Sequence, residues 1–180
     1  MSRRCRKVVN GVTNEFLYDG WNLTRESSFG PSGSVTTNIY SWGMDLSGTL
    51  QGAGGIGGLI SVTRNGETFY PVCDGNGNIT EYIDAGGTVV AHREYDAYGN
   101  TVVAAGPMVN DFHFWFSSKY LDQETGLYYY GYRYLEPAIG RWLSRDLLGE
   151  KGGKNLLSFV ENQPIHRTDL NGLAANDDVM

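Results

Sequence analysis

Basic residues, cysteines and metal-ligand patterns are all scarce in this chain of 180 residues. Its 14 Lys and Arg residues against 20 Asp and Glu give a formal net charge of −6, so it lacks the basic surface that nucleic-acid binding needs. Two cysteines, Cys5 and Cys73, are too few for a disulfide framework, and we expect two free thiols. The three histidines show no ligand spacing, so no zinc site and no other cofactor is indicated.

Long apolar runs are also missing. The most apolar stretch, residues 56–62, is far shorter than the roughly 20 residues that cross a bilayer as a helix. The basic start at residues 3–7 is not followed by the apolar region of a signal peptide. We therefore expect no membrane span, and we interpret residues 1–15 as a basic N-terminal extension with a solvated end.

Glycine and tyrosine are abundant, with 25 and 12 residues, and this combination favours strands joined by tight turns. A turn cluster recurs at residues 74–78, 84–87 and 96–100, rich in Asp, Gly and Asn. Between these clusters, residues 79–83 and 88–95 alternate apolar and polar side chains, as strands do. The sequence therefore predicts an all-β fold, with a meander of hairpin repeats over residues 16–117 in a curved or spiralling sheet.

Such hairpins cannot each bury an apolar face alone, and a short row of them leaves open sheet edges. We therefore expect this chain to be the end of a longer structure, or to pair through its edges with a second copy or a partner.

The segment 48–60 is rich in glycine and contains a formal G-x-G-x-x-G pattern at Gly52, Gly54 and Gly57. A nucleotide site would need a strand before this pattern and a helix after it. The hairpin context supplies no such unit. We interpret the segment as a connection that packs closely against another backbone.

The last third of the chain carries a series of motifs in a fixed order. They are Thr125-Gly126-Leu127-Tyr128-Tyr129, Arg133-Tyr134, Gly140-Arg141-Trp142, Leu143-Ser144-Arg145-Asp146, Gly152-Gly153-x-Asn155-Leu156, Asn162-Gln163-Pro164 and Asp169-Leu170-Asn171-Gly172-Leu173. Tyrosine-aspartate pairs precede them at Tyr18-Asp19 and Tyr95-Asp96. In these residues the chain resembles the C-terminal part of bacterial Rhs/YD-repeat proteins, with the Rhs repeat-associated core domain at residues 118–173.

The resemblance implies a fold and a function. In this family the repeats wind into a hollow β-shell, and the core domain, with short helical turns, caps one end of it. In toxin-bearing members the core is an aspartic self-protease that releases a C-terminal toxin inside the shell. Secretion or cell-surface display through a specialised system is also implied.

Matched to the family, Asp146 and Asp169 stand for the two catalytic aspartates and Arg133 for the accompanying arginine. The bond cut would join Leu173 to Ala174. Beyond it lies a short tail, residues 174–180, too short to fold as a toxin.

The chemistry of these residues supports two interpretations. Two carboxylates held together share a proton, so one can act as a general base on water and the other as an acid on a peptide carbonyl. Arg133 could then hold a carboxylate. Alternatively, Asp146 and Asp169 simply form turns and Arg133 stacks among tyrosines. Leu147 and Leu170 follow the aspartates, where family members usually have proline.

Three functions therefore stay open: a structural cap of a toxin-encapsulating shell, an aspartic autoprotease of a single turnover, and a module that binds carbohydrate or cell surfaces without catalysis. The aromatic stretches 113–116 and 128–134 could serve the third, although core or cross-strand packing is the more usual role of such runs.

Overall fold

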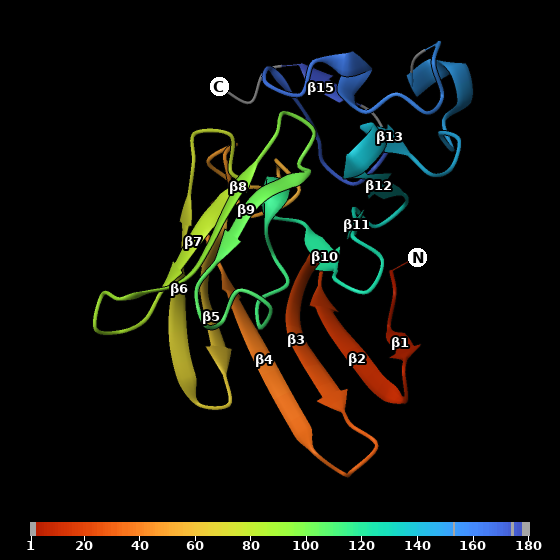
Figure 1. The fold of residues 1–180 in the computed structure, drawn as a ribbon. Coiled ribbons are helices and arrows are strands. Elements are labelled where there is room, and N and C mark those ends of the chain that lie inside the picture. The colour runs from red at the N-terminus through yellow and green to blue at the C-terminus, as the bar shows by residue number, and fades with distance from the viewer. Residues whose placement is uncertain (1–2, 153, 174, 178–180) are drawn as a thin grey trace.

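The computed structural model describes residues 3–152, 154–173 and 175–177, which form three antiparallel sheets (Figure 1). The first sheet has nine strands in sequential order, β1 to β9, the second has four, β10 to β13, and the third has two, β14 and β15. Helical structure within the described residues is limited to short 3₁₀ turns, η1 to η4. The predicted all-β fold is confirmed.

The nine-stranded sheet contains β1 (Arg6–Val9), β2 (Val12–Asp19), β3 (Asn22–Phe29), β4 (Val35–Trp42), β5 (Leu59–Arg64), β6 (Glu67–Cys73), β7 (Ile79–Ile83), β8 (Val89–Tyr95) and β9 (Thr101–Ala105). The smaller sheets contain β10 (Tyr120–Asp122), β11 (Leu127–Tyr129), β12 (Tyr134–Glu136), β13 (Arg141–Trp142), β14 (Arg167–Asp169) and β15 (Ala175–Asp177). The 3₁₀ turns are η1 (Phe116–Ser118), η2 (Pro137–Ile139), η3 (Gly149–Gly152) and η4 (Val160–Asn162).

The three repeated turns share one local mechanism. In each, the Oδ1 atom of the first aspartate, Asp74, Asp84 or Asp96, accepts hydrogen bonds from the backbone amides two and four residues later, at 2.8–3.0 Å. The fourth residue of each turn is a glycine with φ between 74° and 86°, a conformation that glycine adopts without steric cost. These turns join β6 to β7, β7 to β8 and β8 to β9, which confirms the predicted meander of hairpins.

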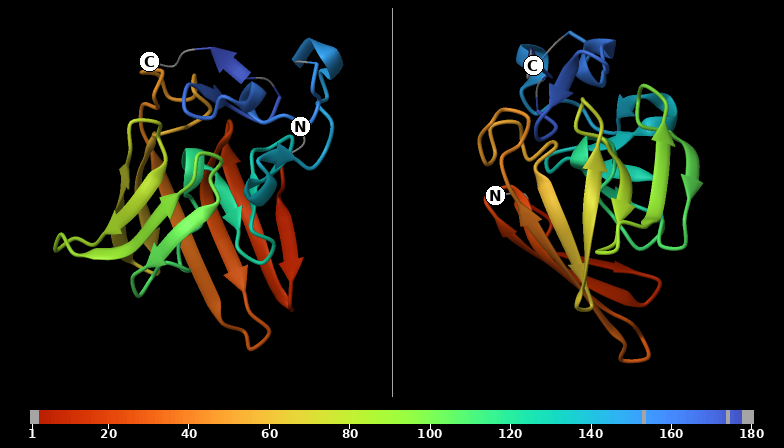
Figure 2. Two further views of the ribbon diagram at one scale, coloured as in Figure 1. Left: turned by 45° about the horizontal axis from the view of Figure 1, so that its top comes forward. Right: turned by 90° about the vertical axis from the view of Figure 1, so that its left-hand side faces the viewer.

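The concave side of the large sheet is filled by residues 112–120, which we call the central segment (Figure 2). Its aromatic rings reach several strands: Phe112 stacks on Tyr82 at 3.9 Å between ring centroids, and Phe114 meets Tyr40 edge-on at 4.9 Å. Trp115 is fully buried. The core of the protein therefore lies between the sheet and a segment that follows it in the chain.

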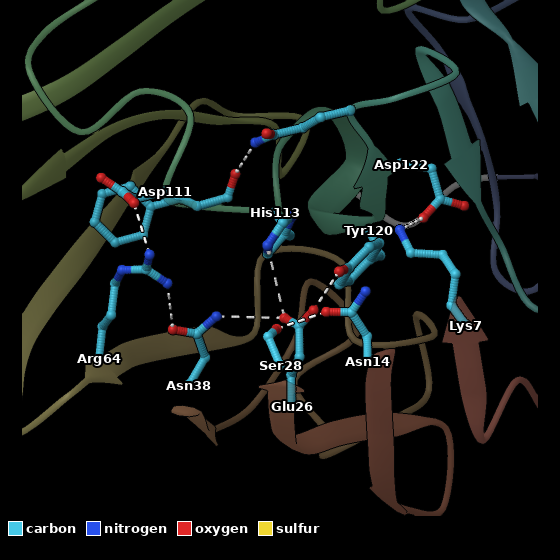
Figure 3. A network of polar contacts seen from close by, with 12 residues as sticks. Lys7, Asn14, Glu26, Ser28, Asn38, Arg64, Asp111, His113, Tyr120 and Asp122 are labelled. Atoms are coloured by element: carbon cyan, nitrogen blue, oxygen red, sulfur yellow. Dashed lines mark hydrogen bonds and ion pairs between the residues drawn. The ribbon is translucent and has the colours of Figure 1, made fainter. Parts of the chain in front are cut away.

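A buried carboxylate also joins the sheet to the central segment (Figure 3). Glu26 of β3 is 1% exposed and accepts hydrogen bonds from the hydroxyls of Tyr120 at 2.6 Å and Tyr40 at 2.9 Å. Asn38 donates to the same side chain at 3.3 Å, and His113 lies 3.8 Å from it. The charge of Glu26 is thus surrounded by donors from β4 and from the central segment.

The N-terminal residues belong to the fold, so the prediction of a solvated end is wrong for Arg4 and Lys7. Arg4 pairs with Asp122 of β10 at 2.6 Å, and Lys7 pairs with the same carboxylate at 2.7 Å. All three side chains are largely buried, because neighbouring aromatic rings cover them. The sheet starts at Arg6, earlier than the boundary at residue 16 predicts, and its first strand is tied to the C-terminal part of the chain.

Candidate functional site

Arg133 lies between the two predicted aspartates in a buried cluster. Its Nη2 atom is 2.9 Å from Oδ2 of Asp146 and 3.3 Å from Oδ2 of Asp169. The three residues are 3%, 9% and 2% exposed, respectively. The structure therefore brings together three residues that the sequence places far apart.

Local turns aim both carboxylates at the arginine. Asp146 uses its Oδ1 atom to accept the Leu148 amide at 2.7 Å, just before η3. Asp169 ends β14, and its Oδ1 atom accepts the amides of Asn171, Gly172 and Leu173 at 3.1, 2.6 and 3.1 Å. One oxygen of each carboxylate thus forms the turn, and the other faces Arg133. Both aspartates therefore form turns, as the structural interpretation expects, and Arg133 bridges their second oxygens.

Arg133 also fixes the chain next to the predicted cleavage site. Its Nε atom donates to the carbonyl oxygen of Gly172 at 2.5 Å, and its guanidinium lies over the Trp142 ring at 4.3 Å. The neighbouring Tyr132 amide donates to the carbonyl of Asn171 at 3.1 Å. Leu173 is half-buried, whereas Ala174 lies outside the described residues.

Two buried cations face the two carboxylates of this cluster: Arg133 contacts both of them, and the charge of Lys119 acts on Asp169. Burial raises the pKa of Asp169 above its usual value, although the Gly172 amide and Arg133 partly counteract this effect. Burial also lowers the pKa of Arg133, which its two carboxylate neighbours partly restore. The raised pKa of Asp169 favours a proton on this carboxylate, as general-acid catalysis requires.

Sequence reasoning missed Lys119, which is buried beside this cluster. Its Nζ atom donates to the carbonyl oxygens of Gly54 and Leu170, each at 2.8 Å, and lies over the Tyr130 ring at 5.4 Å. The one feature of the sequence that could have indicated this position is that Lys119 is the single charged residue within the aromatic run of residues 112–121. A lysine within such a run must find partners in the core, because burying it without them is costly.

The Gly-rich segment packs as predicted. Gly54 has φ +62°, and a Cβ atom on it would lie 2.5 Å from the carbonyl oxygen of Leu170. The interpretation as a close backbone contact is confirmed, and the contacted backbone is the residue after Asp169.

Other kinds of site find little support in the described residues. No group of three or more His, Cys, Asp or Glu side chains there is placed to hold a metal ion. No helix in the same ranges is long and apolar enough to cross a membrane. Cys5 and Cys73 are both free. Tyr128, Tyr129 and Tyr130 are buried, so these rings offer no platform for a sugar.

Comparison with known proteins finds a family that matches this chain. The Teneurin YD-shell family model matches residues 53–165. The tRNA3(Ser)-specific nuclease WapA of Bacillus spizizenii is 30% identical over 174 residues, which cover 94% of this chain and 7% of the relative. Toxin subunit YenC2 of Yersinia entomophaga is 42% identical over 98 residues, covering 53% of this chain and 10% of the subunit.

A solved structure shows the same fold. The crystal structure of TcdB2-TccC3 without its hypervariable C-terminal region superposes with a TM-score of 0.73 and 26% identity, covering 96% of this chain and 8% of that one. The chain thus spans a tenth or less of the length of these relatives. With its sequential hairpin sheet and its family match over more than half of its length, this chain belongs to the Teneurin YD-shell family of Rhs-type YD-repeat proteins.

Proposed function

We propose that this chain is the closing part of a YD-repeat shell and cuts itself once, after Leu173, using Asp146 and Asp169. The observation that carries the proposal is the buried position of Arg133, which contacts both carboxylates and the carbonyl of Gly172, one residue before the bond.

The proposed reaction is hydrolysis of one peptide bond by one water molecule. Asp146 acts as the base and takes a proton from the water while the water oxygen attacks the Leu173 carbonyl carbon. Asp169, whose pKa is raised by burial, holds the proton and donates it toward the carbonyl oxygen. The tetrahedral intermediate then collapses: the nitrogen of Ala174 takes up the proton that Asp146 removed from the water and leaves as an amine. Asp169 regains its proton from a hydroxyl of the intermediate, and Leu173 keeps a new carboxyl group.

The relatives support the wider role. A shell fragment follows from the family and the fold. One relative is named a nuclease and another a toxin subunit, which supports a shell that encloses a toxin. Under this proposal, the repeat sheet, which starts at Arg6, extends to residue 117, and residues 118–173 form the cap. Within the sequence given, the cut would release residues 174–180.

The direct test of cleavage is an intact-mass measurement. The purified chain, incubated over several days at pH 4 to 8, should lose the mass of residues 174–180, and the shortened product should end at Leu173. A full-length mass at every pH would contradict the proposed self-cleavage while leaving the shell role in place.

The shell role predicts that the outer edges of the large sheet pair with other strands. The edge strand β9 exposes Val102 at 65%, and no Pro or Lys lies on it to block pairing. We expect the isolated chain to self-associate in light scattering, and Val102→Lys to make it monomeric. Ile39→Lys is the control, because Ile39 is exposed on the central strand β4. A monodisperse wild-type monomer would count against edge pairing.

A further inference from the structure

We propose that Lys119 is a positioning residue for the self-cleavage site and that it makes this site depend on the folded repeat sheet. Lys119 bridges the turn that carries Asp169 and the Gly-rich loop between β4 and β5. This inference rests on the proposed function. It adds that the cut is regulated by folding: the site is complete only when the sheet is.

The Gly-rich loop is held by its own Asp45, by the turn between β2 and β3 and by the central segment. Gln51 of the loop accepts the amide of Trp21 in that turn at 2.9 Å. Asp45, which is buried, accepts the amides of Ala53 and Gly55 through its Oδ2 atom at 2.7 and 3.0 Å. Ser118 accepts the amide of Gly57 at 2.9 Å. The loop is therefore fastened to the turn between β2 and β3 and to the central segment.

The same loop touches the catalytic turn directly. Gly54 approaches Leu170 so closely that a Cβ atom would overlap its carbonyl, and Lys119 holds the carbonyl oxygens of both residues. The close approach of Gly54 and Leu170 leaves the turn no room to move toward the sheet.

Three successive carbonyl oxygens of the catalytic turn thus each have a donor. Leu170 is held by Lys119, Asn171 by the Tyr132 amide and Gly172 by the Arg133 guanidinium. Two of these donors come from one loop of the cap. Of these three donors, Lys119 is the one that also binds the Gly-rich loop, through the carbonyl of Gly54.

The charge of Lys119 also makes folding stability depend on pH. Burial lowers the pKa of Lys119 to about 8, and Asp169 and Asp45 partly oppose this shift. The unfolded chain, with the ordinary lysine pKa of 10.5, binds more protons between pH 8 and 10.5. Folding stability from this group therefore rises with pH across that window, and below pH 8 the full penalty of a buried ammonium applies.

The test compares Lys119→Met with Lys154→Met, since Lys154 is an exposed lysine of the cap. By intact mass, Lys119→Met should cut at least about tenfold more slowly, whereas Lys154→Met should cut at the wild-type rate. By hydrogen exchange, the amides of residues 171–173 should lose protection in Lys119→Met while those of β2 to β4 keep it. Between pH 8 and pH 10, the denaturation midpoint of the wild type should rise relative to the midpoint of Lys119→Met at the same pH.

The outcomes separate the two proposals. Wild-type cleavage and unchanged exchange in Lys119→Met would overturn the positioning role and leave self-cleavage standing. If the wild type is not cut but the amides of residues 171–173 lose protection in Lys119→Met, self-cleavage is overturned and the positioning role of Lys119 stands. If Lys119→Met fails to fold, Gly54→Ala repeats the test, because it displaces the loop and keeps the lysine. Equal cleavage by a folded Gly54→Ala protein would then overturn the inference.

Discussion

Asp169→Asn should slow cleavage at the Leu173–Ala174 bond by orders of magnitude and leave the sheets folded. An asparagine Oδ1 atom can still accept the three amides that Asp169 accepts, so the turn is kept. The amide group cannot carry a transferable proton at its other end, so the acid of the pair is lost. The ion pair between Arg133 and Asp146 is kept in this variant.

The expected loss of rate is about 10²- to 10⁴-fold, the usual contribution of a positioned acid or base. Asp146→Asn should cause a loss of the same order, because the base is then missing. Asp19→Asn is the control, since Asp19 is an exposed aspartate at the end of β2. Intact mass over time gives the rates, and circular dichroism checks the fold. Cleavage of either variant within threefold of the wild type would remove that carboxylate from the mechanism.

Glu26→Ala should produce the largest loss of stability in the protein, about 3–5 kcal/mol in the free energy of unfolding. The substitution leaves the hydroxyls of Tyr40 and Tyr120 without their acceptor inside the core. It also leaves His113 without its nearest carboxylate and opens a cavity between the sheet and the central segment.

Urea denaturation monitored by tryptophan fluorescence measures this loss. Glu15→Ala is the control, because Glu15 is exposed on the neighbouring strand β2, and it should change the free energy of unfolding by less than about 0.5 kcal/mol. Equal midpoints for the two variants would show that the Glu26 network does not hold the core together.

The same network predicts sensitivity to acid. Burial alone would raise the pKa of Glu26, but His113 and the three donors outweigh it and hold the pKa below its usual value. Stability from Glu26 is therefore present above pH 4.5 and is lost as the pH falls through the lowered pKa. This pH dependence should be absent from Glu26→Ala, which makes it a second readout of the same variant.

Most of the large sheet could be predicted from the sequence because its structure is local. Each repeated turn is specified by an aspartate and a glycine a few residues apart, and each strand pairs with its neighbour in the chain. Periodicity and turn chemistry therefore sufficed there. The family resemblance supplied Arg133, Asp146 and Asp169, whose spacing alone permitted a cluster without requiring one.

Contacts between distant parts of the chain could not be predicted. Nothing near Arg4 in the sequence points to Asp122, and nothing near Lys119 points to Leu170. Local signals were also absent at Ser117 and Ser118, which adopt φ of 50° and 48° without glycine or asparagine. Tertiary packing sets these positions, including the turn that brings Lys119 toward the site.

The filling of the sheet by the central segment has a consequence for synthesis of the chain. The strands up to β9 can pair with their neighbours as soon as they leave the ribosome, because each contact is local. The inner face of these strands, however, stays exposed to water until Phe112, Phe114 and Trp115 have been synthesised. During that interval the nascent sheet exposes an apolar surface, which is when a chaperone would bind and when neighbouring chains would aggregate.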